Sequence, residues 1–225
     1  MCGRFVGYRS LEEMRRQFRI DRVEAEISPN YNVAPTQEVL SIIREEDGNI
    51  LRRLHWGLIP FWARDTSIGA RMINARAETV AEKPAFRNAF RKRRCLIPAD
   101  GFYEWKKEKS GKQPLLITLP DEAPFAFAGL WETWDEKGKA DPIHSCTILT
   151  TEASRSIRDI HDRMPVILKA DAHAEWLDPG RQDVDLVEIL KSRTHTEFKA
   201  RPVSKTVNSV KNNSRELIGQ ADEKR

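Results

Sequence analysis

The sequence of 225 residues predicts a single α+β domain with a curved, barrel-like and mainly antiparallel sheet and peripheral helices. Three observations predict it. Strand-like segments recur at short spacing along most of the chain, and helical patterns are scattered among them. The regular strand–helix alternation of a doubly wound sheet is absent. No repeat or linker divides the chain, so we expect one domain over residues 1–213 and a polar tail over 214–225 that frays.

The first expected helix begins at Ser10. Ser10 and Glu13 have the spacing of a capping box, and Leu11, Met14 and Phe18 then mark one helical face. After it, an extended loop is expected over residues 31–37. Two strands, joined into a hairpin by the turn-rich residues 46–49, are expected at 39–44 and 51–56.

The later elements follow from the same signals. Residues 57–69 are typical of a long loop, residues 71–76 of a short strand, and residues 84–93 of an amphipathic helix with Phe86 and Phe90 one turn apart. Further strands are expected at 95–98, 102–106, 115–119, 125–131, 146–150 and 165–168, with turns at 110–112 and 136–138. Further helices are expected at 152–157, 171–177 and 184–191.

Composition sets broad limits on function. Lys and Arg number 38 against 34 Asp and Glu, which gives a net charge of +4 and favours an anionic partner only mildly. The three cysteines are odd in number and far apart, and no His/Cys spacing indicates a zinc site, so we expect no metal and no cofactor. The absence of an apolar segment that would serve as a secretory signal or membrane span predicts an intracellular protein.

Cys2 is the most informative residue, because removal of Met1 would leave it with a free α-amine beside its thiol. The ordinary pKa values of these groups are about 8 and about 8.5, so reactive forms of both exist near neutral pH. Such a 1,2-aminothiol condenses with an aldehyde to an imine and then closes a thiazolidine ring. Cys2 alone also fits an accident of sequence.

Four segments combine reactive or hydrogen-bonding side chains. In the first, Cys2 and Gly3 precede Arg4, a side chain that could hold an anion. In the second, Asn74 and Arg76 are two residues apart, so they point to the same face of an extended segment. That pair fits an amide and a guanidinium beside a phosphate, and equally a strand end with solvated side chains.

The other two segments carry proton-transfer groups. Glu104 lies in an aromatic strand, where loss of hydration would raise the pKa of its carboxyl into the range of acid–base catalysis. An outward-facing glutamate paired to a lysine is the alternative. His161, followed by Asp162 and Arg163, is suited to proton transfer at neutral pH and also fits a structural histidine.

Eight motifs follow one another along nearly the whole chain. They are Met-Cys-Gly-Arg-Phe at 1–5, Tyr-Asn-Val-Ala-Pro at 31–35, Trp-Gly-Leu-Ile-Pro at 56–60, Ile-Asn-Ala-Arg-Ala-Glu-Thr at 73–79, Ala-Asp-Gly-Phe-Tyr-Glu-Trp at 99–105, Ile-His-Asp-Arg-Met-Pro at 160–165, Pro-Val-Ser at 202–204 and Asn-Ser-Val-Lys-Asn at 208–212. With these motifs, the sequence resembles the SOS-response-associated peptidase (SRAP) domain, which shields abasic sites in single-stranded DNA.

The resemblance implies a mechanism and a set of roles. The amine of Cys2 would form an imine with the open aldehyde of the abasic sugar, and the thiol would close a thiazolidine crosslink. Glu104 would act as acid and base, His161 would promote sugar opening, and Asn74 would hold the adduct. Contacts to DNA would come from Arg4, Trp62, Arg76 and Arg163, and more weakly from Ser204, Asn208 and Lys211.

Further expectations follow from the resemblance. The partner would be single-stranded DNA that contains abasic sites, bound by a monomer in the cytoplasm or nucleoid, or in the nucleus of a eukaryote. A cysteine-type peptidase activity would release Met1, although an ordinary aminopeptidase would give the same N-terminus. A lyase-like activity of Glu104 and His161 could reopen the ring. Trp62 would stack on bases, and core packing is its equal alternative.

Two other functions remain open from the sequence. Class II glutamine amidotransferases also begin with Met-Cys-Gly and use the N-terminal cysteine as a nucleophile, although Arg4-Phe5 departs from their usual apolar continuation. A non-covalent single-strand-binding module, in which Cys2 has no part, is the second. Ammonia release from glutamine would identify the first, and equal affinity for intact and abasic DNA the second.

Overall fold

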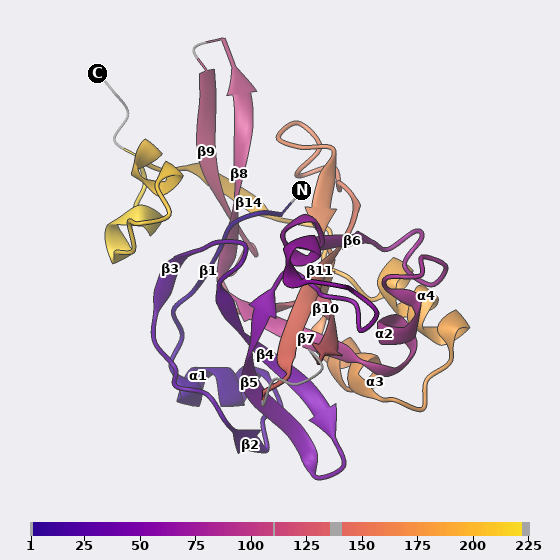
Figure 1. Cartoon of the computed structure of the whole chain (residues 1–225). Coiled ribbons are helices and arrows are strands. Elements are labelled where there is room, and N and C mark those ends of the chain that lie inside the picture. Colours follow the sequence, from indigo (N-terminus) through magenta and orange to yellow (C-terminus); the bar gives the residue numbers. More distant parts are fainter. Residues whose placement is uncertain (1, 110, 136–140, 222–225) are drawn as a thin grey trace.

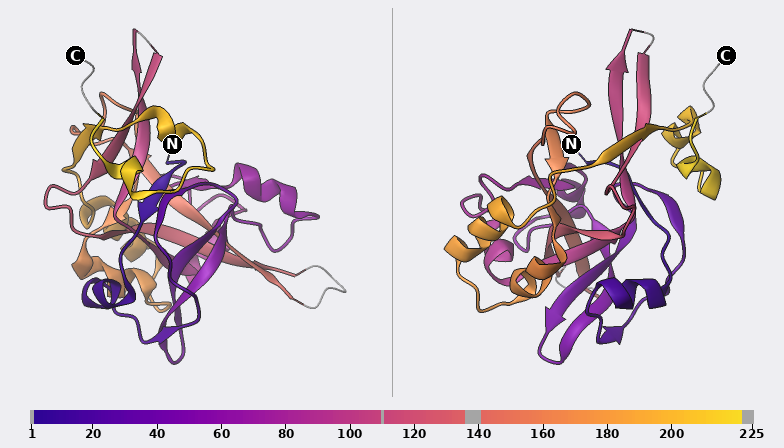
Figure 2. Two further views of the ribbon diagram at one scale, coloured as in Figure 1. Left: turned by 90° about the vertical axis from the view of Figure 1, so that its left-hand side faces the viewer. Right: turned by 180° about the vertical axis from the view of Figure 1, so that it is seen from behind.

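The computed structural model describes residues 2–109, 111–135 and 141–221. Two mainly antiparallel sheets form the centre of the molecule, and short helices lie around them (Figures 1 and 2). The smaller sheet has the strand order β14-β9-β8-β1-β3, with β1 at Phe5–Gly7, β3 at Asn30–Val33, β8 at Gly101–Glu108, β9 at Gly111–Thr118 and β14 at Lys199–Pro202. The β8–β9 hairpin projects well beyond the rest of the fold (Figure 1).

The larger sheet has nine strands, in the order β12-β11-β10-β7-β4-β5-β2, with β13 on β10 and β6 on β11. Its strands are β2 at Arg22–Val23, β4 at Glu38–Glu45, β5 at Gly48–Trp56, β6 at Asn74–Arg76, β7 at Arg94–Ala99, β10 at Phe125–Trp134, β11 at Ile143–Glu152, β12 at Arg163–Pro165 and β13 at Ile167–Leu168. A two-residue parallel pairing of β5 with β11 curls this sheet into a partial ring, which is not a clear barrel.

The helices are short. The α-helices are α1 at Leu11–Gln17, α2 at Arg87–Lys92, α3 at His173–Leu177 and α4 at Asp183–Ser192, and the 3-10 turns are η1 at Thr66–Arg71, η2 at Ala170–Ala172, η3 at Lys205–Asn208 and η4 at Arg215–Ile218. Helices α2, α3 and α4 gather on one side of the larger sheet (Figure 1). None of the helices in the described part of the chain is long and apolar enough to cross a membrane.

The buried side chains form three clusters, which pack between these layers or on their outer face. The first packs the helices against the larger sheet and contains Phe18, Phe90 and Trp176. The second lies between the two sheets and contains Cys2 and Phe102 together with the other two cysteines. The third covers the outer face of the smaller sheet, where the C-terminal segment packs on Tyr103. Alternation along β8 therefore directs Phe102 inward and Tyr103 outward, which fixes the direction of Glu104.

Most sequence-based expectations agree with these elements. The capping box of Ser10 and Glu13 is present, the 39–44 and 51–56 strands form a hairpin, and the expected helices at 84–93, 171–177 and 184–191 correspond to α2, α3 and α4. The single mixed α+β fold is confirmed. The turn expected at 136–138 lies outside the described residues.

Three local expectations were wrong. Gly111 and Lys112, expected in a turn, are the first residues of β9 and pair with β8. Residues 152–157 are not a helix, because β11 continues to Glu152 and a turn follows over residues 155–160. Residues 30–33 form β3 rather than a loop, because β1 supplies a partner strand. The domain boundary at residue 214 stays a prediction; residues 215–218 form η4, and Leu217 is buried in the outer cluster.

Candidate functional site

Strand pairing brings the N-terminal segment to Glu104. Strand β1 runs antiparallel to β8, with Phe5 opposite Phe102, and the N–H of Tyr103 donates to the carbonyl of Arg4 at 2.9 Å. The same register continued toward the chain start sets Cys2 and Gly3 beside Glu104. Glu104 points into the space between the sheets, the direction of Phe102, and is only 4% exposed. The alternative of an outward-facing glutamate is thereby excluded.

Cys2 is fully buried and held by its backbone. The side-chain amide of Asn74 donates from Nδ2 to the carbonyl oxygen of Cys2 at 2.8 Å. Burial raises the pKa of the Cys2 thiol, and the nearby negative charge of Glu104 raises it further. The thiol is therefore protonated at neutral pH.

Asn74 reaches Cys2 from the other sheet. Strand β6 pairs parallel to β11, with Asn74 opposite Ile148, so the amide is fixed on a strand rather than on a loop. Its Oδ1 atom is buried and accepts no hydrogen bond from the described part of the chain. A buried acceptor of this kind is able to bind a donor on a ligand.

Glu104 has the most informative titration in the site. Loss of hydration raises the pKa of its carboxyl to about 7, and the negative charge of Asp162 also raises it. Both protonation states are thus populated at neutral pH, as a group that donates and accepts protons requires. The charge of Asp162 acts on Glu104 because the turn that carries His161 faces this strand.

His161 lies in the turn before β12 and is partly buried. The backbone N–H of Arg163 donates to its Nδ1 at 3.0 Å, and Oδ1 of Asp162 lies 2.7 Å from the same nitrogen. Burial lowers the pKa of His161, with Asp162 opposing the shift.

Arg4 is engaged inside the protein. Its Nη1 donates to Oδ1 of Asn32 at 2.6 Å and to the carbonyl of Val207 at 2.9 Å, and its guanidinium lies 5.7 Å from the centre of the Trp105 ring. Asn32 is 1% exposed and also donates to the carbonyls of residues 209 and 212. These contacts fasten the C-terminal segment to the smaller sheet.

Arg163 and Arg76 differ in their partners. Arg163 binds Glu78 through two nitrogens at 2.7 and 2.9 Å, and it also donates to the carbonyl of Thr150 at 2.7 Å. Arg76 ends β6 with an exposed side chain and makes no ion pair with the described residues. Of the two, Arg76 is thus the cation available to a ligand without rearrangement.

Trp62 belongs to a rigid loop. Gly57 adopts φ +143, and a Cβ there would lie 2.6 Å from the carbonyl oxygen of Gly69, so the two ends of the loop close only on glycine. The indole N–H of Trp134 donates to the carbonyl of Ala63 at 2.9 Å. Trp62 is 50% exposed, which excludes core packing.

The three C-terminal candidates lie around η3. Ser204 caps this turn by accepting the N–H of Thr206, and the side chain of Asn208 accepts the indole N–H of Trp105 at 2.8 Å. Lys211 is exposed. They lie on the outer face of the smaller sheet, separated from Cys2 by β8.

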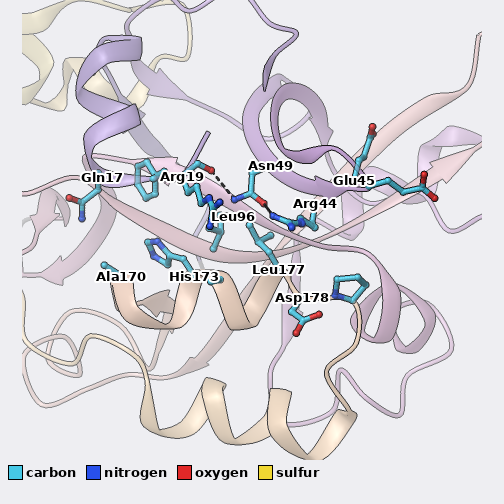
Figure 3. A pocket seen from close by; sticks show the side chains of 14 residues that line it. Gln17, Arg19, Arg44, Glu45, Asn49, Leu96, Ala170, His173, Leu177 and Asp178 are labelled. Atoms are coloured by element: carbon cyan, nitrogen blue, oxygen red, sulfur yellow. Dashed lines mark hydrogen bonds between the residues drawn. The ribbon is translucent and has the colours of Figure 1, made fainter. Parts of the chain in front are cut away.

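A pocket of about 860 Å³ contains none of the sequence-predicted site residues (Figure 3). It lies between β4–β5 and α3, where the side chain of Asn49 bridges the backbone of Arg19 and the guanidinium of Arg44. Cys2 and Glu104 are instead buried where the two sheets meet. Among the residues that the structure describes, no group of three His, Cys, Asp or Glu side chains could hold a metal ion.

The sequence model of the family described as "SOS response associated peptidase (SRAP)" matches residues 1–210. The chain belongs to this SRAP family. It is 49% identical to "Abasic site processing protein YoaM" of Bacillus subtilis, with 97% of each chain covered. It is 34% identical to "Abasic site processing protein YedK" of Escherichia coli, covering 97% of this chain and 99% of that one.

A crystal structure of a protein from Bacteroides thetaiotaomicron matches the fold with a TM-score of 0.83 at 25% identity, over 98% of this chain and 100% of that one. The SRAP motifs at 1–5, 73–79, 99–105 and 160–165 thus meet in one place of this fold, although they are far apart in the sequence. Sequence analysis gave no role to Asn32. The only indication of its importance in the sequence was its place in the motif Tyr-Asn-Val-Ala-Pro.

Proposed function

We propose that this protein shields abasic sites in single-stranded DNA by forming a covalent thiazolidine crosslink through Cys2 after Met1 has been removed. The observation that carries the proposal is the contact of Asn74 with the Cys2 carbonyl beside a carboxyl, Glu104, whose pKa is about 7. The names of the SRAP relatives as abasic site processing proteins support it.

The first step is imine formation. The α-amine of Cys2 attacks C1′ of the open sugar aldehyde, and the resulting carbinolamine loses water. Protonated Glu104 supplies the proton for the leaving hydroxyl, and the carboxylate then accepts a proton from nitrogen. Burial holds the thiol protonated, which leaves the amine as the first nucleophile.

The second step closes the ring. The sulfur of Cys2 adds to the imine carbon, and its proton passes to the nitrogen, so no atom is lost. The saturated ring removes the electron sink that would eliminate the 3′ phosphate, and the strand stays intact. The imidazole of His161 is suited to give a proton to the sugar oxygen during ring opening, and Asn74 to hold the adduct.

The DNA contacts follow from exposure and charge. Trp62 offers a stacking face, and Arg76 and Lys211 offer free cations for phosphates. Arg4 and Arg163 would reach phosphates by exchanging internal partners, while Ser204 and Asn208 would contact the backbone from η3. We propose that the protein acts as an intracellular monomer on single-stranded DNA.

The same groups serve two further proposed activities. Glu104 and His161 would catalyse self-cleavage of Met1 as a cysteine-type peptidase. In the reverse direction they would reopen the thiazolidine, as a lyase-like activity. Both reactions need a proton donor and acceptor near Cys2, which a carboxyl with a pKa of about 7 supplies.

A denaturing gel tests the proposal. The native chain is incubated with single-stranded DNA that carries one abasic site, and a slower band that survives denaturation is expected. Cys2→Ala must give no such band, and intact DNA must give none with either protein. A native chain that gives no adduct contradicts the proposal. Ammonia release from glutamine would instead identify an amidotransferase.

A further inference from the structure

The projecting end of the β8–β9 hairpin is strongly basic. Residues 105–113 contain one acidic residue, Glu108, and four lysines, at positions 106, 107, 109 and 112. Their surplus of three positive charges compares with a surplus of four for the whole chain. Three of the lysines are exposed, Lys106 is half-buried, and none of the four forms an ion pair with the described residues. This end of the hairpin is therefore suited to an anionic ligand.

Two of these lysines face each other across the hairpin. Lys107 is directly opposite Lys112 in the register of β8 and β9, and Glu108, at the next position, points to the other face. Like charges at directly opposite positions destabilise a hairpin. A phosphate bound between the two ammonium groups would replace this repulsion by two charge-assisted hydrogen bonds. The pair thus weakens the free protein in a way that an anionic ligand relieves.

No other described strand pairs with this end of the hairpin. Strand β1 pairs with β8 at residues 101 and 102, and β14 pairs with β9 at residues 115–118. Residues 106–108 and 111–113 pair only with each other, and they project beyond the rest of the fold (Figures 1 and 2). The outer edges of both strands are therefore open to a ligand along this length.

The same hairpin begins at the Cys2 site. Glu104 and Lys106 are two residues apart on β8, so alternation directs both side chains to the same face, with their Cα atoms about 7 Å apart. The positive charge of Lys107 helps to lower the pKa of His161, which places this lysine near the site as well. Glu104 and Lys107 are about 10 Å apart along the strand, a length that spans up to about three nucleotides.

We infer that the β8–β9 hairpin is an arm that binds phosphates of the lesion-bearing strand, on one side of the abasic sugar and within about three nucleotides of it. Lys106 binds the phosphate nearer to the site, and Lys107 and Lys112 share the one beyond it. The inference rests on the proposed function, because it assigns the path of the same DNA strand as it leaves Cys2. Contacts of this kind position the strand and do not depend on the identity of its bases.

The salt dependence of binding tests the arm. Affinity for a single strand with a central tetrahydrofuran site, which lacks the reactive aldehyde, is measured by fluorescence anisotropy at several salt concentrations. Lys106→Gln and the double variant Lys107→Gln/Lys112→Gln should each reduce the slope of log affinity against log salt by about 0.7, the loss of one phosphate contact. Lys191→Gln removes an exposed lysine of α4 and is the matched control, which should keep the native slope. Native slopes in both hairpin variants would overturn the inference.

A trimming series locates the arm on the strand. The native chain should lose slope when the nucleotides within three positions of the tetrahydrofuran site are removed from one end, and not from the other. The triple variant Lys106→Gln/Lys107→Gln/Lys112→Gln should show no such loss at either end. An effect of the hairpin lysines that appears only after a complementary strand has been annealed would overturn the inference, because the arm would then bind a duplex.

Thermal unfolding without DNA tests the repulsion between the paired lysines. Lys112→Gln should unfold at a higher temperature than the native chain, because Lys107 then faces an uncharged side chain. Lys191→Gln should not show this increase. A lower unfolding temperature for Lys112→Gln would contradict the repulsion from which the shared phosphate is inferred.

The proposed function is read out separately, by the covalent adduct of the native chain with a true abasic strand. An adduct together with native salt slopes in the hairpin variants refutes the arm alone. No adduct together with reduced slopes in those variants refutes the crosslink and retains the arm.

Discussion

At the scale of single residues, the site depends on which groups have lost water. Cys2 and Glu104 are both buried, and burial favours the neutral form of each side chain. As pH rises, the carboxyl of Glu104 therefore loses its proton at a lower pH than the thiol of Cys2 does. In the proposed reaction the amine attacks before the thiol, because burial keeps the thiol protonated.

Glu104→Gln should slow crosslink formation by about 10²- to 10⁴-fold, because the amide neither donates nor accepts a transferable proton. The native rate should change through an inflection near pH 7, which the variant lacks. Rates are measured by quenched denaturing gels between pH 5.5 and 8.5. Equal pH profiles for the two proteins would remove Glu104 from the mechanism.

Glu104→Gln should also change how stability depends on pH. Burial raises the pKa of this carboxyl to about 7 in the folded state, above its unfolded value. The contribution of the protonated carboxyl to stability is therefore complete below about pH 4.5 and is lost as pH rises through 7. As pH rises from 5 to 8.5, the free energy of unfolding of the variant should therefore increase, relative to that of the native chain, by on the order of 1–3 kcal/mol.

Urea unfolding at the two pH values measures this difference. Glu108→Gln, exposed on the same strand, is the matched control. A difference between Glu104→Gln and the native chain that is the same at both pH values would show that the carboxyl is not perturbed in the folded state.

At the scale of elements, a buried amide, Asn32, helps to hold the C-terminal segment on the smaller sheet. Nδ2 of Asn32 donates to the carbonyls of Ser209 at 2.9 Å and Asn212 at 2.8 Å, and its Oδ1 accepts from Arg4. Arg4 joins the same three parts, because it also donates to the carbonyl of Val207 in η3.

Asn32→Ala should release residues 205–218 without unfolding the sheets. The carbonyls left without a donor and the lost hydrogen bonds should cost about 1–3 kcal/mol. Hydrogen exchange should speed up for the amides of this segment and stay unchanged for β10. Asn88→Ala, exposed on α2, is the control for an asparagine without such contacts. Uniform exchange changes across the fold would contradict a local role.

Elements differ in how far the sequence predicts them. The hairpin of β4 and β5 and the cap of α1 rest on local signals, so they were predicted well. Strand β3 was not, because its extended conformation depends on β1, which is far away in the chain. The burial of Glu104 follows from alternation once Phe102 is known to face inward. The contacts of Arg4 and Arg163 with Asn32 and Glu78 needed the folded structure.

At the scale of the whole molecule, two sheets close over the N-terminal segment, and Arg76 is exposed on β6, the strand that carries Asn74. The net charge is only +4, so long-range attraction to DNA is modest and individual contacts decide affinity. The overall fold class was predictable from strand spacing. The partial ring of the larger sheet was not, since it depends on two residue pairs between β5 and β11.

Arg76→Ala and Lys211→Ala should each reduce the salt dependence of single-strand binding by about 0.7 in the slope of log affinity against log salt. Both side chains are exposed. Arg16→Ala, which removes an exposed cation of α1 paired with Glu12, should leave the slope unchanged. A slope that none of these variants alters would place the DNA elsewhere on the surface.

The burial of Cys2 has a consequence for the biosynthesis of the protein. An aminopeptidase must thread the first residues into its own cleft, and it cannot do so once β1 has paired with β8, which begins at Gly101. A ribosome needs about 5–20 s to make the intervening hundred residues. Folded protein that retains Met1 should resist an added methionine aminopeptidase that trims the urea-unfolded chain. External removal of Met1 therefore has to occur within that time.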